Sequence, residues 1–295
     1  PLLSLSNKEV YSIPMVLLIG WRGDPSIADH AQHQKQGELT PILLDSMDIP
    51  YRILDSDDKK SQEATRWAIQ EAKVSNCPVA LIAKKGALEK GEKEDLSKLQ
   101  SEFPLFREDV IELLLNHLPE DTFYVASTGR ATRELYYLRE KRGESHSNDF
   151  LNIGAMGHSL SIATGMAISQ NDRLVVCLDG DAAAIMHMGS MAISGQISLP
   201  NLIHVVMNNG VHESVGGQPS VGQNIDFTSI AKSTGYRTVE KSVNNEKELL
   251  DIFDTLQDGL APTFIDILIR KGMRSKLPPL DIVPLELKQE LVNGL

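Results

Sequence analysis

The chain has 295 residues, with 41% hydrophobic and 23% charged side chains, as in globular proteins rather than disordered or fibrous ones. Its formal net charge of −11, with no stretch dense in lysine and arginine, argues against nucleic acid as a partner. No apolar run approaches the roughly 18–20 residues that span a bilayer, so we expect no membrane contact. Cys77 and Cys177 lie beside apolar residues and are expected to be buried free thiols, which together favours a cytoplasmic protein.

The first part of the chain alternates strand-like and helix-like segments, which is the pattern of an α/β domain. Apolar segments at 15–20 and 78–83 predict buried strands, 51–54 predicts a short strand, and 39–47 and 61–74 predict helices. Between the first strand and the first helix runs a long polar stretch, 21–37, which we expect to be a functional loop. A solvated surface turn is the alternative for this stretch.

Residues 84–101 are rich in lysine and glutamate without an apolar period, and we predict a linker there, with a salt-bridged exposed helix as the alternative. The α/β pattern then restarts. Strands are predicted at 123–126, 150–153, 174–178, 202–207, 237–239 and 263–269, and helices at 108–118, 132–141, 160–168, 227–234 and 246–256. The segment from Pro278 is proline-rich and then helical. The predicted domains are 1–90 and 107–295, joined by 91–106.

Polar residues follow two neighbouring strands of the second domain. Strand 174–178 runs into Asp179-Gly180-Asp181, and strand 202–207 runs into Asn208-Asn209. One strand–helix–strand unit joins them, so the strands are parallel and their carboxyl ends meet at the edge where α/β folds bind ligands.

Carboxylate, amide and carbonyl oxygens suit Mg²⁺, which completes its shell with water and phosphate oxygens. The small residues 182–184 leave their backbone N–H groups open to a phosphate. The residues alone therefore predict a Mg²⁺-diphosphate site. The alternative is that the aspartate and the Asn-Gly pair merely close two turns.

The Gly180-Asp181 pair with Asn208-Asn209 resembles the GDG…NN signature of thiamine-diphosphate enzymes, although Ala182 stands where the signature has glycine. Three segments resemble the phosphonopyruvate decarboxylase family more specifically: MNNGVHESVGGQP at 207–219, IGWRGD at 19–24 and HQKQG at 33–37. The similarity extends over nearly the whole chain.

This resemblance implies two thiamine-diphosphate-binding-type domains, each a parallel sheet flanked by helices. The first is incomplete and corresponds to the C-terminal part of a pyrimidine-binding domain, and the second is a diphosphate-binding domain. It implies a homo-oligomer that holds thiamine diphosphate between subunits. Asp181, the Asn209 side chain and the main-chain carbonyl of Val211 would hold Mg²⁺. The implied reaction is decarboxylation of phosphonopyruvate, a small 2-oxo acid, to phosphonoacetaldehyde and CO2.

The resemblance also assigns cofactor contacts. Ser127, Thr128 and Gly129 fall where the family contacts the diphosphate, with an ordinary helix N-cap as the alternative. Met156 would be the wedge under the cofactor, with core packing as the alternative. The further predicted cofactor contacts are His158, Gly180, Ala182 and Ala183.

Side-chain chemistry suggests the acid–base and substrate-binding groups. Histidine suits proton transfer near neutral pH. We predict catalytic roles for His212, Glu213 and His33. Arg22, Gln34 and Lys35 are expected to bind the anionic head of the substrate. We expect His187, inside a helix, and His204, inside a strand, to be packing residues.

The family depends on a glutamate that activates the cofactor, and by the resemblance it precedes Pro1, so we expect a fragment that turns over poorly alone. Sulfopyruvate, or another 2-oxo acid, is the alternative substrate, because sulfonate and phosphonate are both tetrahedral oxyanions. A non-catalytic subunit that binds the cofactor is the alternative from a different functional class.

Overall fold

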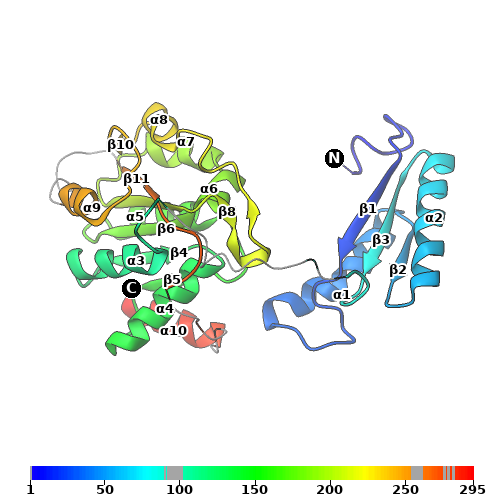
Figure 1. Cartoon of the computed structure of the whole chain (residues 1–295), viewed down its shortest axis with the longest axis horizontal. Coiled ribbons are helices and arrows are strands. Elements are labelled where there is room, and N and C mark those ends of the chain that lie inside the picture. Colours follow the sequence, from blue (N-terminus) through cyan, green and yellow to red (C-terminus); the bar gives the residue numbers. More distant parts are fainter. Residues whose placement is uncertain are drawn as a thin grey trace. The chain divides into compact units, whose positions relative to one another are not determined.

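The computed structural model describes residues 2–89, 91, 102–253, 262–274, 277, 280 and 283–295. The chain divides into two compact units, Pro1–Glu92 and Lys93–Leu295. Each unit is built on a parallel sheet with helices packed against it (Figure 1), which confirms the predicted α/β class. Residues 92–101, most of the predicted linker, lie outside the described residues.

The first unit has a three-stranded parallel sheet in the order β1-β3-β2. The strands are β1 (Met15–Gly20), β2 (Tyr51–Leu54) and β3 (Pro78–Ala83), and all six residues of the central β3 are buried. Helix α2 (Asp58–Ser75) packs on one face through Ala64, Ala68 and Ala72, which recur every four residues and so form one apolar stripe. Cys77, expected to be buried, is partly exposed at the turn before β3.

The predicted loop 21–37 is only partly a loop, because helix α1 (Ala31–Ser46) begins eight residues before the predicted 39–47 helix. His33, Gln34 and Lys35 therefore lie on a helix. Its first turns carry good helix formers but no apolar period, which is why the pattern missed them. The remaining loop is closed by a tight contact: a Cβ added at Gly37 would lie 1.7 Å from the carbonyl oxygen of Gly23.

The second unit has a six-stranded parallel sheet in the order β10-β11-β7-β6-β4-β5. The predicted strands are all present, with bounds shifted by at most two residues. They are β4 (Phe123–Ala126), β5 (Asp149–Leu151), β6 (Val175–Gly180), β7 (Leu202–Asn208), β10 (Arg237–Thr238) and β11 (Thr263–Leu268). A short antiparallel pair, β8 (Val211–His212) and β9 (Gln218–Pro219), follows β7 and encloses the 3-10 turn η2 (Glu213–Val215).

Helices cover both faces of this sheet and form two buried clusters. On one face pack α3 (Arg107–His117), α4 (Arg130–Arg142) and α9 (Glu246–Phe253). On the other pack α5 (Ser159–Ser169), α7 (Gly189–Gln196) and α8 (Phe227–Ser233), with α6 (Asp181–Met186) between β6 and α7. The C-terminal helix α10 (Pro284–Gly294) contacts β5.

The strand register brings three polar turns together. Gly180 of β6 pairs with Met207 of β7, and Ala126 of β4 pairs with Leu178 of β6. The carboxyl ends of β4, β6 and β7 therefore lie side by side, as predicted for β6 and β7. Ser127, Asp181 and Asn209 directly follow these three strands in that order.

Candidate cofactor site

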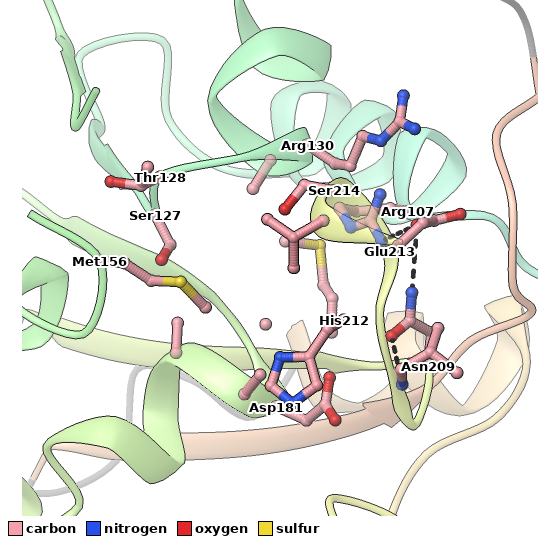
Figure 2. A pocket seen from close by; sticks show the side chains of 17 residues that line it. Arg107, Ser127, Thr128, Arg130, Met156, Asp181, Asn209, His212, Glu213 and Ser214 are labelled. Carbon is pink, nitrogen blue, oxygen red and sulfur yellow. Dashed lines mark hydrogen bonds and ion pairs between the residues drawn. The ribbon is translucent and has the colours of Figure 1, made fainter. Parts of the chain in front are cut away.

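A cavity of about 100 Å³ lies at this edge of the second unit's sheet (Figure 2). Eleven residues of the predicted site line it: Ser127, Thr128, Met156, Gly180, Asp181, Ala182, Ala183, Asn209, Val211, His212 and Glu213. They come from segments that are far apart in the sequence. The fold therefore brings together the predicted diphosphate, metal and acid–base residues of this unit. Gly129 and His158 do not line the cavity.

Asp181 is the first residue of α6, and it is only 2% exposed. Its Oδ2 accepts a hydrogen bond from the Ser220 hydroxyl. Burial raises the pKa of the Asp181 carboxyl, while hydrogen bonds from Ser220 and the Ala182 backbone N–H act in the opposite direction. A carboxylate that is poorly hydrated and has few donors gains most from a bound cation.

Asn208 and Gly222 hold the chain against this carboxylate. The Asn208 side-chain amide donates to the Gly222 carbonyl over 2.9 Å. A Cβ added at Gly222 would lie 2.3 Å from Asp181 Oδ2, closer than any real side chain comes. The second asparagine of the motif, Asn209, lines the cavity (Figure 2). The first, Asn208, fixes the loop that lies against Asp181.

The donor set fits a hard divalent cation. Asp181 offers a carboxylate, Asn209 an amide oxygen and Val211 a main-chain carbonyl, which are the ligand types that Mg²⁺ takes. On the other side of the cavity the hydroxyl of Ser127 is buried and has no hydrogen-bond partner among the described residues. Because a buried hydroxyl without a partner is costly, this atom marks a place for a ligand oxygen.

The turn after β4 does not act as an ordinary side-chain cap. Gly129, with φ of 123°, is the N-cap of α4, and no side chain caps that helix. Thr128 instead donates to the side-chain oxygen of Asn152 over 3.1 Å. The Ser-Thr-Gly turn is therefore not used for capping, and Ser127 stays available to a diphosphate.

Met156 is half-buried and lines the cavity rather than filling the core. The turn that carries it is held by Asn152, whose side chain donates to the Ala155 carbonyl over 2.7 Å and accepts from the Ala155 N–H over 2.9 Å. This placement favours the predicted contact with a bound cofactor over plain packing.

Four histidines of the second unit were given roles from the sequence. His212 lies on β8 and lines the cavity next to Asp181 (Figure 2). His158 is exposed, and its ring centroid lies 4.2 Å from that of His187. His187 was expected inside a helix, but it lies at the end of α6, because the chain turns there before α7. His204 is fully buried in β7, as predicted, and lies 3.1 Å from Asp179.

The sequence did not indicate a group of charged residues beside this cavity. Arg107, 6% exposed, is bonded through Nη1 to Glu134 over 2.9 Å and through Nη2 to Glu213 over 2.7 Å. Burial raises the pKa of Glu134 to about 7, against the lowering effect of Arg107. Arg130 also lines the cavity, and burial lowers the pKa of its guanidinium. Arginines near a predicted diphosphate site would have pointed to this group. They were missed because these residues share no short motif in the sequence.

In the first unit, Arg22 and His33 meet at Asp29. Arg22 Nε lies 2.9 Å from Asp29 Oδ2, and His33 Nδ1 lies 3.2 Å from Asp29 Oδ1. Although burial acts to raise it, donors from His30, His33 and Gly23 lower the pKa of Asp29 to about 2.

A second cavity of about 450 Å³ in this unit is lined by Arg22 and Asp29, together with Lys84 and Lys85, which the sequence had placed in the linker. Lys35 is exposed and pairs with Glu38 over 2.8 Å, and Gln34 is exposed. The structure therefore groups Arg22 with His33, but it does not bring Gln34 or Lys35 to this cavity.

Among the described helices, none combines the length and the apolar character needed to cross a membrane.

The match to a known protein family falls within the second unit. The family model "Thiamine pyrophosphate enzyme, C-terminal TPP binding domain" matches residues 127–267, which include every residue of the second unit that was predicted for the site. A phosphonopyruvate decarboxylase of Streptomyces viridochromogenes is 31% identical over 97% of this chain and 73% of its own length. That of Streptomyces hygroscopicus is 31% identical over 94% of this chain and 70% of its own length.

The sulfopyruvate decarboxylase subunit beta of Methanococcus maripaludis is 26% identical over 65% of this chain and 98% of its own length. The identity to the two Streptomyces proteins is higher and covers more of this chain. The chain thus belongs to the phosphonopyruvate decarboxylase family of thiamine-diphosphate-dependent 2-oxo acid decarboxylases.

Proposed function

We propose that this protein decarboxylates phosphonopyruvate to phosphonoacetaldehyde and CO2 with thiamine diphosphate and Mg²⁺. When bound, the cofactor supplies the nucleophilic carbon and the electron sink that loss of CO2 from a 2-oxo acid requires. One observation carries the proposal: a single cavity collects the oxygen donors of Asp181, Asn209 and Val211 together with the unpartnered hydroxyl of Ser127.

The residues of the second unit would bind the cofactor. Asp181, Asn209 and the Val211 carbonyl would hold Mg²⁺, which typically retains phosphate oxygens as its other ligands. Ser127 and Thr128 would bind the diphosphate, with the backbone beside the small residues Gly180, Ala182 and Ala183. Arg130, whose charged form is disfavoured by burial, would gain a counter-charge from that diphosphate.

His212 is proposed for proton transfer. It lines the cavity beside Asp181, and histidine is the side chain that most often transfers protons in enzymes. For the phosphonate head of the substrate we propose Arg22 and His33, which Asp29 holds together. A phosphonate dianion needs such charge-assisted donors.

The test measures binding and turnover separately. Titration calorimetry with thiamine diphosphate and Mg²⁺ is expected to show binding that requires the cation. A coupled aldehyde assay is then expected to show phosphonoacetaldehyde formed from phosphonopyruvate, and a robust rate would refute the expectation that this chain alone turns over poorly. Binding without product would support the non-catalytic, cofactor-binding alternative, and absence of binding would refute the cofactor assignment.

Sulfopyruvate is the second candidate substrate, since proteins named sulfopyruvate decarboxylase subunit beta are 26–27% identical to this chain over about two thirds of it. Measuring kcat/KM for both 2-oxo acids on one preparation would decide. We expect the larger value for phosphonopyruvate, and a larger value for sulfopyruvate would overturn the choice of substrate.

We also propose a homo-oligomer with the cofactor at a subunit interface. Support comes from the relatives that carry the name of a subunit. Light scattering of the purified protein is expected to give a mass that is a multiple of the chain mass. A monomer that binds the cofactor fully would contradict this arrangement.

A further inference from the structure

We propose that Glu213 is a positioning residue, held by Arg107, that fixes the side chain of Asn209 with its amide oxygen facing the cation. The inference deepens the proposed function and rests on it, because Asn209 is a cation ligand only if that function is right. It concerns a contact that the sequence did not indicate, since Glu213 was predicted there to have a catalytic role.

The chemistry of its neighbours fixes the orientation of the Asn209 amide. The nitrogen Nδ2 lies 3.1 Å from Glu213 Oε2, and a carboxylate in an ion pair can only accept. On the other side the Val211 N–H, which can only donate, lies 3.2 Å from Oδ1. Exchanging the nitrogen and oxygen of the Asn209 amide would break both contacts. Glu213 and Val211 therefore both require Nδ2 to face Glu213 and Oδ1 to face the Val211 N–H.

The carboxylate of Glu213 is itself fixed by Arg107. Its Oε2 receives Arg107 Nη2 over 2.7 Å, and the side chains of the two residues are 5% and 6% exposed. Arg107 is the first residue of α3, and its other end group is bonded to Glu134 on α4. Two helices therefore anchor the guanidinium, and a buried charge-assisted hydrogen bond from an anchored group restricts the carboxylate that accepts it.

Such an arrangement has a physical use at a metal site. An amide oxygen binds a cation well only when it is already aimed at it, and groups that bond to metal ligands typically change metal affinity about 10–100-fold. Glu213 accepts from both Arg107 and Asn209 through one oxygen (Figure 2). These contacts suit orientation of a ligand better than exchange of protons with a substrate.

A buried ion pair that only stabilises the fold is the competing explanation, and Glu134 provides the matched control. Glu134 and Glu213 bond the same guanidinium over 2.9 and 2.7 Å, but of these two described residues only Glu213 is also bonded to Asn209. The substitutions Glu134→Gln and Glu213→Gln are the same chemical change on the two sides of Arg107. A purely structural role predicts similar effects for both.

The experiment measures the dissociation constant of Mg²⁺ in saturating thiamine diphosphate by calorimetry, alongside thermal melting. We expect Glu213→Gln to weaken Mg²⁺ binding about 10–100-fold. Glu134→Gln should change it by less than about threefold, even if both lower the melting temperature. Equal effects, or no effect of Glu213→Gln, would overturn the inference. If the unmodified protein bound no Mg²⁺, the proposed function would fail, which is a distinguishable result.

A second variant remains informative even if Glu213→Gln alone folds poorly. Combining Asn209→Asp with Glu213→Gln exchanges donor and acceptor, keeps an oxygen ligand at position 209 and leaves an acceptor for Arg107. Mg²⁺ binding should return to within about tenfold of the unmodified protein. A double variant that binds no better than the single variants would show that the two positions are not partners.

Discussion

The two units present their predicted functional residues in different ways. In the second unit Asp181 is 2% exposed and Asn209 3% exposed, and hydrogen bonds with Ser220 and Glu213 hold them in place. In the first unit the side chain of Arg22 is 56% exposed and that of His33 is 23% exposed, with Asp29 as their shared partner. The comparison teaches that the proposed cation site is preorganised by the sheet, whereas the candidate substrate groups depend on a few exposed contacts.

The largest expected effect follows from removing a ligand at the preorganised site. Asp181→Ala should abolish turnover and weaken Mg²⁺ binding by more than about 100-fold, beyond what loss of a supporting contact costs. Calorimetry and the aldehyde assay measure both. Asp226→Ala is the control, because Asp226 caps α8 through Ser229 and should affect only stability. If Asp181→Ala still bound the cation, the second unit would not hold a preorganised cation site, and the contrast between the two units would fail.

A smaller effect separates chemistry from binding within the same cavity. His212→Asn should lower kcat by about 10²–10⁴-fold, the usual contribution of a group that transfers a proton. The dissociation constant of the cofactor should hardly change, because the cation donors remain. His117→Asn, at the end of α3, is the control. Loss of cofactor binding with unchanged kcat at saturation would instead make His212 a binding residue.

Next comes the exposed group of the first unit. Arg22→Met should raise KM for phosphonopyruvate about 10–100-fold, since a charge-assisted hydrogen bond contributes about 1.5–3 kcal/mol. Cofactor affinity should stay the same, in contrast to Asp181→Ala. Lys60→Met, which removes a surface pair with Asp57, serves as the matched loss of charge. If Arg22→Met left KM unchanged, the first unit would lose its proposed role in binding the phosphonate.

The smallest effects concern the pH dependence of stability, to which one aspartate in each unit contributes with opposite sign. Burial raises the pKa of Asp266 to about 6, against the effect of hydrogen bonds from Ser242 and Asn208. The folded state therefore binds this proton more tightly than the unfolded chain does. The contribution of Asp266 to the free energy of unfolding should fall as the pH rises from about 4 to 6, by up to about 3 kcal/mol. Asp266→Asn should remove this decline, as measured by circular dichroism during denaturation.

Asp29, whose pKa is lowered to about 2, should behave in the opposite way. Its stabilising contribution is present above the ordinary aspartate pKa and is lost as the pH falls towards 2. Asp29→Asn should remove that contribution, and tryptophan fluorescence can follow it because Trp21 and Trp67 both lie in the first unit. Equal pH slopes for the two variants would show that burial does not distinguish the two carboxylates.

Local sequence was sufficient to predict that Asp181 and Asn209 lie at one cavity. Strands β6 and β7 are continuous apolar runs, and parallel pairing then requires Asp181 and Asn209 to reach one edge. The start of α1 was missed because its first two turns bury little, so no apolar period marks them.

Arg107 and Glu134 could not be predicted from the sequence. Arg107 is separated from Glu213 by 106 positions, and their contact exists only because α3 and α4 pack beside the cavity. Lys84 and Lys85 were missed for a related reason: a lysine-rich segment is typical of a solvated linker, and only the fold places these residues on a cavity.

Gly222 shows how a residue without a functional group can be as constrained as a ligand. A methyl group there would overlap the Asp181 side chain, and the hydrogen bond from Asn208 to the Gly222 carbonyl anchors the backbone at this position. In a saturation library selected for cation retention, we expect position 222 to admit glycine alone and alanine to be rejected as completely as charged residues. Intolerance at this position would then report steric exclusion rather than chemistry.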